Sequence, residues 1–334
     1  MKNRREFMKG ATTGAVLLGA QSKLGLAGML DSHDQRAQAG KSKVVVARDA
    51  ALHNAGGQPD EKRVLALLDR AIAAYTGRDN PVEAWKRIVP TDKVIGIKTN
   101  GLGGKGICTH QALVFAVAER LQQAGVRPGN ILIWDRNARD LEACGLSIST
   151  DPNRIRCYGS DVSGFEDQVE TWGTAHARIS KILTRECAMV IGLPILKDHD
   201  LAGVTFAMKN MYGVLERPQD LHSSGCNPGV ADLNCIPVIR EKVRFTIGDA
   251  MSSVCDGGPG FHPEHLWQPN ALIVGEDRVA IDHTAGQMIE RRRAETGLPT
   301  LEAAGRPPRY IATAADGAHK LGTDDPKRMH LMEI

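Results

Sequence analysis

Short apolar segments alternate with amphipathic segments along most of this chain. Strands are predicted at residues 43–47, 93–98, 131–134, 188–193, 243–247 and 271–274, where Val, Ile and Leu predominate. Helices are predicted from Glu61 to Tyr75 and over residues 109–124, where Thr109 is expected to cap the first turn. Apolar strands separated by helices predict an α/β fold, with a mostly parallel or mixed sheet covered by helices on both faces.

The chain shows no internal repeat and no low-complexity linker. Residues 40–334 are therefore predicted to form a single α/β domain. The interval from Asn137 to Arg178 has few long apolar runs and several turn signals, which makes it a candidate for a small inserted lobe.

Composition and charge exclude several classes of protein. The 334 residues include 42 Lys and Arg against 39 Asp and Glu, a net charge of +3. This balance leaves no continuous electropositive surface, so sequence-specific nucleic-acid binding is excluded. Gly has no period of three, no apolar heptads run on, and Leu, Ile and Val recur throughout, which excludes collagen, coiled coil and disorder.

The first 39 residues contain three regions in a characteristic order. Arg4-Arg5 precedes an apolar stretch over residues 10–20, and Ala37-Gln38-Ala39 follows. This order resembles a twin-arginine (Tat) export signal that is cleaved after Ala39. The resemblance implies export to the periplasm through the Tat translocase. Lys23 interrupts the apolar run, so no stable membrane span is predicted. The alternative is a chance Arg pair before an interfacial helix.

The chain contains seven Cys and no C-x-x-C, so their spacing predicts neither a zinc ribbon nor an iron-sulfur cluster. Buried apolar positions are expected for Cys144, Cys157 and Cys187. Cys226, Cys235 and Cys255 lie in a region rich in Gly, Pro and polar residues and are candidates for one disulfide or for a ligand.

Polar and charged residues follow most of the predicted strands. Lys98-Thr99-Asn100, Asp135-Arg136-Asn137, Lys197-Asp198-His199 and Gly248-Asp249 are examples. In open α/β sheets, ligands bind beyond the carboxyl ends of the strands, so these residues are expected to line a crevice. The alternative is that strand ends are polar because they meet water.

Two later segments carry polar residues that packing does not require. From Pro194 to Gly213, a helix is expected to begin at Asp200 and to place Thr205 and Lys209 four residues apart on one face. If this helix is buried, Lys209 and Asn210 need a partner or a ligand anion, whereas on a surface helix Lys209 would simply extend into water. The second segment, around Asp249 and Asp256-Gly257-Gly258, is a loop that could present backbone amides, act as a lid or lie at the surface.

An ordered set of motifs resembles one known family. The motifs are Ile97-Lys98-x-Asn100, Leu193-Pro194-x-Leu196-Lys197-x-His199, Val204-Thr205, Lys209-Asn210-x-x-Gly213, His222, Asp249, Gly258-Pro259 and Asp277-x-Val279-Ala280-x-Asp282. Together they resemble the family called domain of unknown function 362, over roughly residues 43–287. Many members of that family carry appended ferredoxin modules. This chain lacks the C-x-x-C-x-x-C-x-x-x-C-P motif of such a module, so no iron-sulfur cluster is inferred.

These observations predict an exported enzyme that binds a small anionic substrate or cofactor, with a metal ion as a further candidate. His199, Lys197 and Lys209 are expected to converge on one site as the catalytic residues, with His199 as the proton carrier because an ordinary imidazole titrates near neutral pH. The predicted ligand-binding residues are Lys98, Asn100, Thr205, Asn210, His222 and Gly258, and Asp249 and Asp256 are candidate metal ligands.

Two other functions compete with this prediction. One is a non-catalytic periplasmic protein that binds a cofactor or a redox partner. The other is a nucleotide-dependent oxidoreductase, because residues Gly101 to Gly106 match G-x-G-x-x-G between a strand and a helix. Asp135 would then be the acidic residue of that motif, although it lies farther along the chain than usual.

Overall fold

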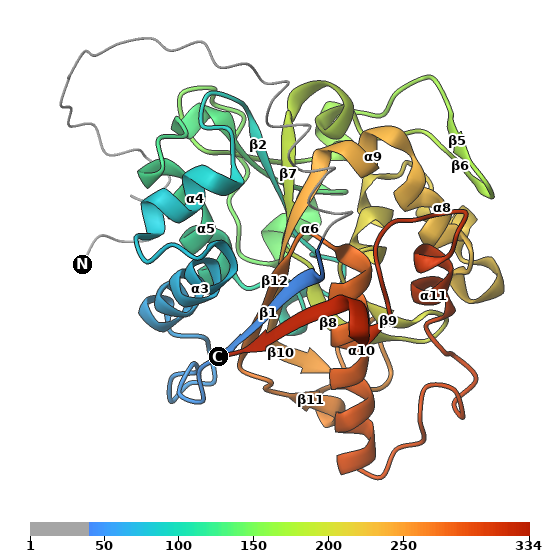
Figure 1. Ribbon diagram of the computed structural model, residues 1–334. Helices are drawn as coiled ribbons and strands as arrows, with labels where there is room; N and C mark the ends of the chain where they lie inside the picture. The colour runs from blue at the N-terminus through green and yellow to red at the C-terminus, as the bar shows by residue number, and fades with distance from the viewer. Residues whose placement is uncertain (1–39) are drawn as a thin grey trace.

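A computed structural model describes residues 40–334 and shows a large central sheet (Figure 1). The expected export signal, residues 1–39, lies outside the described residues. The sheet contains β1 (Ser42–Arg48), β2 (Ile95–Lys98), β3 (Ile131–Asp135), β4 (Arg156–Gly159), β7 (Met189–Gly192), β8 (Ile195–His199), β9 (Gly203–Thr205), β10 (Val243–Val254), β11 (Leu266–Trp267), β12 (Ala271–Gly275) and β13 (Met329–Glu333). Its main order is β13-β1-β12-β10-β7-β2-β3-β4.

Both parallel and antiparallel pairs occur in this sheet. The neighbours β10, β7, β2, β3 and β4 run parallel. The strand β12 runs antiparallel to β1 and to β10. Each of the six segments predicted as strands is a strand here, so the expectation of a mixed α/β sheet is confirmed.

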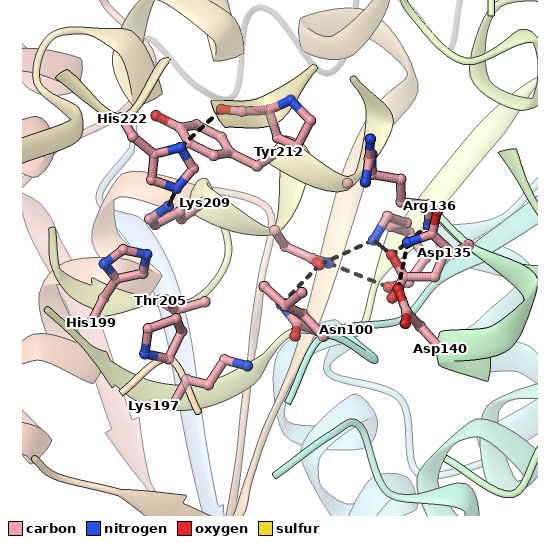
Figure 2. Close-up of a pocket in the computed structure, with 17 residues that line it drawn as sticks. Asn100, Asp135, Arg136, Asp140, Lys197, His199, Thr205, Lys209, Tyr212 and His222 are labelled. Atoms are coloured by element: carbon pink, nitrogen blue, oxygen red, sulfur yellow. Dashed lines mark hydrogen bonds and ion pairs between the residues drawn. The ribbon is translucent and has the colours of Figure 1, made fainter. Parts of the chain in front are cut away.

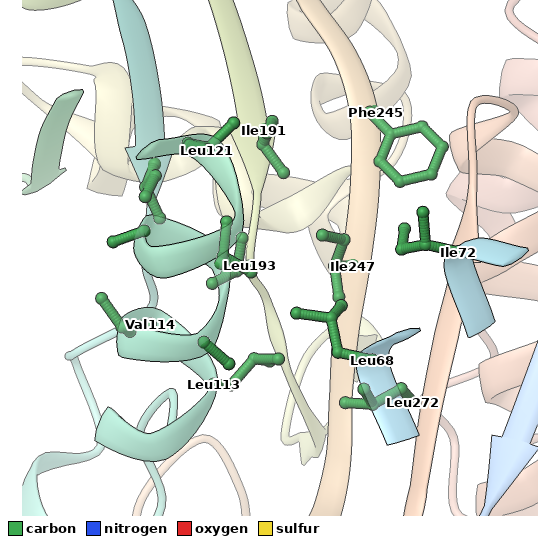
Figure 3. Packing of buried hydrophobic residues seen from close by; sticks show 14 of the residues in the cluster. Leu68, Ile72, Leu113, Val114, Leu121, Ile191, Leu193, Phe245, Ile247 and Leu272 are labelled. Atoms are coloured by element: carbon green, nitrogen blue, oxygen red, sulfur yellow. The ribbon is translucent and has the colours of Figure 1, made fainter. Parts of the chain in front are cut away.

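Helices cover both faces of the sheet. One face packs against α3 (Glu61–Thr76), α4 (Pro81–Ile88) and α5 (Gln111–Gln123), and Figure 3 shows Leu68 and Leu113 from these helices beside Ile247 and Leu272 from the strands. The other face packs against α8 (Gly229–Cys235), α9 (Pro237–Lys242), α10 (Arg278–Glu295) and α11 (Arg309–Ala315). Successive strand residues point to opposite faces, so a sheet that is buried on both sides requires near-continuous apolar strands.

The helix predicted from Glu61 is confirmed as α3. The Asp60 side chain accepts hydrogen bonds from the backbone N–H groups of Lys62 and Arg63, and the helix ends before Gly77, whose φ is 68°. The second predicted helix begins one residue later than a Thr109 cap would give, at Gln111, and its N-cap residue is His110. Thr109 is therefore not the cap. Its hydroxyl instead donates to the Leu193 carbonyl at 2.6 Å and accepts from the Asn100 N–H at 2.8 Å.

The prediction of a helix that begins at Asp200 is wrong, because residues 195–205 form a β-hairpin. In it β8 and β9 pair antiparallel, with Lys197 opposite Thr205 and His199 opposite Gly203. Gly203 has a φ of 72°, and a Cβ at this position would lie 2.3 Å from the Arg306 carbonyl oxygen. A positive φ ends any helix and favours glycine. Lys209 lies beyond the hairpin, in a short 3-10 helix, η4 (Lys209–Val214).

The interval around residues 137–178 is divided between two sheets. Its strand β4 is the edge of the main sheet beside β3, flanked by the short helices α6 (Ala138–Ala143) and α7 (Ser160–Ser163). The strands β5 (Glu170–Trp172) and β6 (Ala175–Ala177) form a separate two-stranded hairpin.

The seven cysteines all lie in the described part of the chain and are free thiols. Of the two alternatives for Cys226, Cys235 and Cys255, a disulfide or a ligand, the disulfide is therefore wrong. Cys157 and Cys187 are buried as expected, whereas Cys144 is partly exposed. Within residues 40–334, none of the helices combines the length and apolar character needed to cross a bilayer.

Candidate functional site

A cavity of about 150 Å³ lies where the carboxyl ends of β2 and β3 meet the hairpin formed by β8 and β9. Figure 2 shows the side chains that surround it in three groups, from the strand ends, from the hairpin and from the segment that follows the hairpin. The lining residues are Lys98, Asn100, Leu102, Asp135, Arg136, Asn137, Asp140, Lys197, His199, Thr205, Lys209, Asn210, Tyr212, Gly213, Pro218, His222 and Pro259.

Lys98 ends β2 and belongs to a closed hydrogen-bond network. Its Nζ donates to Asp135 Oδ1 at 2.6 Å and to the Thr99 carbonyl at 2.7 Å, and Asn210 Oδ1 lies 3.3 Å away. The second Asp135 oxygen accepts from the backbone N–H of Gly101 at 2.6 Å. Lys98 and Asp135 thus form a buried ion pair in the cavity wall.

Lys197 has different surroundings. Its side chain is 0% exposed, and its Nζ has no hydrogen-bond partner among the described residues. Thr205, its partner across the hairpin, has an unpartnered hydroxyl, and the Asn100 Oδ1 is unpartnered as well. Burial lowers the pKa of Lys197 to about 8. Buried polar atoms nearly always have partners, so these three atoms leave hydrogen-bonding capacity at one cavity.

His199 lies two residues after Lys197 and therefore projects from the same side of β8. Its Nδ1 lies 3.1 Å and 3.3 Å from the backbone N–H groups of Leu201 and Ala202, and 2.9 Å from the Asp200 carboxylate. Burial, and to a smaller extent the positive charge of Lys209, lowers the pKa of His199 to about 2. His199 therefore does not have the ordinary imidazole pKa that the sequence argument assumed, and its role as proton carrier stays a prediction.

Lys209 is held between an aromatic ring and an imidazole. Its Nζ lies 3.9 Å from the centroid of the Tyr212 ring and 3.5 Å from His222 Nε2. His222 Nδ1 donates to the Pro218 carbonyl at 2.9 Å, which leaves Nε2 as an acceptor that faces the ammonium. Burial lowers the pKa of Lys209 to about 8, while the ring face favours the cation.

Asp282 of α10 holds the segment that carries Lys209 and Asn210. It is 0% exposed, and its two carboxylate oxygens accept the backbone N–H groups of Ala207 at 2.6 Å and Met208 at 3.1 Å. The Tyr310 hydroxyl lies 3.2 Å from the same carboxylate. These hydrogen bonds give a structural role to Asp282, the last residue of the motif Asp277-x-Val279-Ala280-x-Asp282. Asp277, the first residue of that motif, is the N-cap of α10, and its side chain accepts from the backbone N–H groups of Val279 and Ala280.

The structure places three predicted site residues outside the cavity. Asp249 accepts from the backbone N–H and the ring Nδ1 of His110, both at 2.8 Å. Asp256 is paired with Arg293 at 2.7 Å and also with Arg306. A Cβ on Gly258 would lie 1.9 Å from the Asp198 carbonyl oxygen, so this glycine lets its loop pack on β8, and the next residue, Pro259, reaches the cavity. Asp249, Asp256 and Gly258 therefore make contacts within the protein and do not line the cavity.

The other eight predicted site residues all line the cavity. They are Lys98, Asn100, Lys197, His199, Thr205, Lys209, Asn210 and His222. No group of three or more His, Cys, Asp and Glu side chains in residues 40–334 is arranged to hold a metal ion. The ligand set suggested by Asp249 and Asp256 therefore has no counterpart in this part of the chain.

Contacts within the protein account for the glycines of the G-x-G-x-x-G segment. A Cβ on Gly103 would lie 2.2 Å from the Ile107 carbonyl oxygen, and one on Gly106 would lie 2.1 Å from the Phe261 ring. The acidic residue expected to bind a ribose, Asp135, is occupied by Lys98 and by the Gly101 N–H. A bulky substitution at Gly103 would distort the loop itself, so such a variant cannot test nucleotide binding.

Nine lining residues were not among the predicted catalytic, ligand-binding or metal-binding residues, and Arg136, Asp135 and Tyr212 are three of them. Arg136 lies just after β3, and its guanidinium donates to the carbonyls of Leu215 at 3.1 Å and Glu216 at 2.7 Å. Asp135 ends the same strand beside β2, and the convergence of parallel strand ends places it, like Arg136, in the crevice expected from the sequence, although the anion-binding prediction gave neither residue a role. No sequence signal marked Tyr212, because its ring matters only through its position under Lys209.

The chain belongs to the family Domain of unknown function (DUF362), whose model matches residues 95–287. The matched range includes every residue assigned to the cavity. A comparison with curated proteins finds no significant match.

Two solved structures are similar in fold. A protein from Thermotoga maritima aligns with a TM-score of 0.45 at 10% identity, over 72% of this chain and 60% of its own. The lactate racemase apoprotein from Thermoanaerobacterium thermosaccharolyticum aligns with a TM-score of 0.44 at 10% identity, over 76% of this chain and 57% of its own. This chain thus spans less than two thirds of either protein.

Proposed function

We propose that the protein is an enzyme that binds a small organic anion in the cavity between the strand ends and the β8–β9 hairpin. The observation that carries the proposal is the wholly buried, unpartnered Nζ of Lys197. A buried ammonium without a counter-ion is costly, and a bound anion would remove that cost. The neighbouring orphaned hydroxyl of Thr205 provides a neutral hydrogen-bond donor for the same ligand.

The lysines also suit proton transfer. Burial lowers the pKa of Lys197 and of Lys209 to about 8, which is close to neutral pH. A group whose pKa lies near the working pH can both accept and release a proton at small cost. Perturbed lysines in a cavity are typical of catalytic sites, and this favours an enzyme over the competing proposal of a non-catalytic binding protein.

The proposal is tested by calorimetric titration of the purified protein. We expect saturable binding of oxalate. Inorganic phosphate is titrated as a second anion, and the ratio of the two affinities shows whether the site selects its ligand by shape or by charge. The Lys86→Met variant is the matched control, since Lys86 pairs with Glu83 on the surface and lies outside the cavity. A lack of binding by both anions would contradict the proposal. Saturable binding of NAD(P) or FAD instead would favour the nucleotide-dependent oxidoreductase.

We further propose that residues 1–39 direct export through the Tat translocase and that the protein acts in the periplasm. The Arg4-Arg5 pair, the apolar stretch and Ala37-Gln38-Ala39 support the proposal, because they follow one another in the order that such signals require.

Replacing both Arg4 and Arg5 by Lys should hold the precursor in the cytoplasm, because the translocase recognises the guanidinium pair and not the charge alone. The measurement is immunoblotting of periplasmic and cytoplasmic fractions. A Lys41→Arg variant, altered beyond the signal, should be exported normally. Normal periplasmic appearance of the double Lys variant would contradict export by this route.

A further inference from the structure

We propose that Lys197 forms an imine with a short 2-oxo acid, so that the substrate carries a ketone next to its carboxylate. This inference rests on the proposed function, and it adds a substrate class and a covalent step. It follows from the different surroundings of the three lysines that line one cavity, Lys98, Lys197 and Lys209.

An amine attacks a carbonyl only when it is unprotonated. Lys98 lies 2.6 Å from the Asp135 carboxylate, so its nitrogen is already engaged in an ion pair. Lys209 lies over the Tyr212 ring at 3.9 Å, and a ring face stabilises the ammonium. Lys197 has neither an acceptor nor a ring and is 0% exposed. Burial lowers the pKa of Lys197 and of Lys209 alike to about 8, but of the three lysines only Lys197 has a nitrogen that no acceptor or ring among the described residues engages.

Lys209 lines the same cavity as Lys197. Burial is the main cause that lowers the pKa of Lys197 to about 8, the negative charge of Asp135 opposes this shift, and the positive charge of Lys209 makes a smaller contribution in the lowering direction. If the carboxylate of a 2-oxo acid pairs with Lys209, the ketone at the other end of the molecule can face Lys197.

Thr205 and His199 are placed to bind the ketone end of such a ligand. Thr205 lies opposite Lys197 in the hairpin, and its unpartnered hydroxyl can bond to the carbonyl oxygen. His199 projects from the same side of β8, and its ring is a further hydrogen-bonding group in the cavity wall. A cavity of about 150 Å³ matches a ligand of about six non-hydrogen atoms, since an engineered cavity of that size holds benzene.

The covalent step balances without an external oxidant or reductant. The Lys197 nitrogen forms a bond to the carbonyl carbon as the C=O π bond opens, and a proton moves from nitrogen to that oxygen. The resulting hydroxyl then leaves as water with the second nitrogen proton, and the C=N bond forms. The carboxylate is unchanged and stays paired with Lys209.

The test uses the full chain with pyruvate as the probe and sodium cyanoborohydride as the trap. Hydride adds to the imine carbon and leaves a stable secondary amine, which intact mass spectrometry detects and peptide mapping assigns. We expect one adduct, on the peptide that contains Lys197, and we expect oxalate to suppress it. Lys197→Arg keeps the charge but cannot form an imine, so its adduct should be lost, whereas Lys86→Met should retain it.

The outcomes separate this inference from the proposed function. If oxalate binds but pyruvate gives no adduct, or the adduct lies on Lys209, imine formation at Lys197 is wrong and the anion site stands. An adduct spread over surface lysines, and equally abundant in Lys197→Arg, also overturns the inference. If neither oxalate nor pyruvate binds, both are wrong. Mapping of the wild-type adduct decides the site even if the Arg variant folds poorly.

Discussion

Replacing Lys197 by Met should abolish anion binding and at the same time stabilise the folded protein. The buried ammonium has no partner, so a thioether of similar length removes a desolvation cost and keeps the packing. Titration with oxalate measures the affinity, and chemical denaturation measures the free energy of unfolding. Lys209→Met should weaken binding as well, with a smaller gain in stability, since Tyr212 and His222 already surround that ammonium.

The stabilisation by Lys197→Met should depend on pH in a defined direction. Burial lowers the pKa of Lys197 from 10.5 in the unfolded chain to about 8 in the folded protein. Between these values the unfolded state binds more protons, so the stability of the wild type rises with pH across that window. The gain should therefore be greatest below pH 8, on the order of 3 kcal/mol, and should fade toward pH 10.5.

Two results would contradict this account of the lysines. One is a loss of several kcal/mol of stability in both Met variants with unchanged oxalate affinity, on the scale known for broken buried ion pairs. Lys197 and Lys209 would then be structural. The other is a stability gain that grows above pH 8, which would reverse the sign expected from a lowered lysine pKa.

Replacing Asp282 by Asn should both destabilise the protein and weaken anion binding. The two carboxylate oxygens accept the N–H groups of Ala207 and Met208, and an amide can offer only one acceptor oxygen to those two donors. We expect a loss of about 2 kcal/mol, typical of an unsatisfied buried donor. Lys209 follows directly in the chain, so its ammonium should lose its position. Denaturation and oxalate titration measure the two effects.

Asp60→Asn is the matched control for this prediction. Asp60 also accepts two backbone N–H groups, but it does so at the start of α3 and not beside the cavity. Its replacement by Asn should leave oxalate affinity unchanged. If Asp282→Asn lowers stability and binding remains at the wild-type level, the anchor does not position Lys209.

Local pattern predicted the regular elements because their signals are local. The apolar spacing in α3 repeats with the helix period, and each predicted strand is an apolar run that a doubly covered sheet requires. The hairpin of β8 and β9 escaped this reasoning. Residues after Asp200 permit a helical interpretation, but Gly203 adopts a positive φ against the Arg306 carbonyl, which is far away in sequence. Long-range contact decided the backbone there.

The sequence by itself determined the α/β class, the polar strand ends and most of the side chains that surround the cavity. Strand ends on one edge of a sheet converge whatever the loops do, so Lys98 and Asn100 could be placed in the site from order alone. Tertiary structure alone decided which charges are satisfied. Asp249 pairs with His110, Asp256 pairs with two arginines, and Lys98 pairs with Asp135. Lys197 has no such partner among the described residues. Pairing depends on distances between segments remote in the chain, and sequence spacing does not contain them.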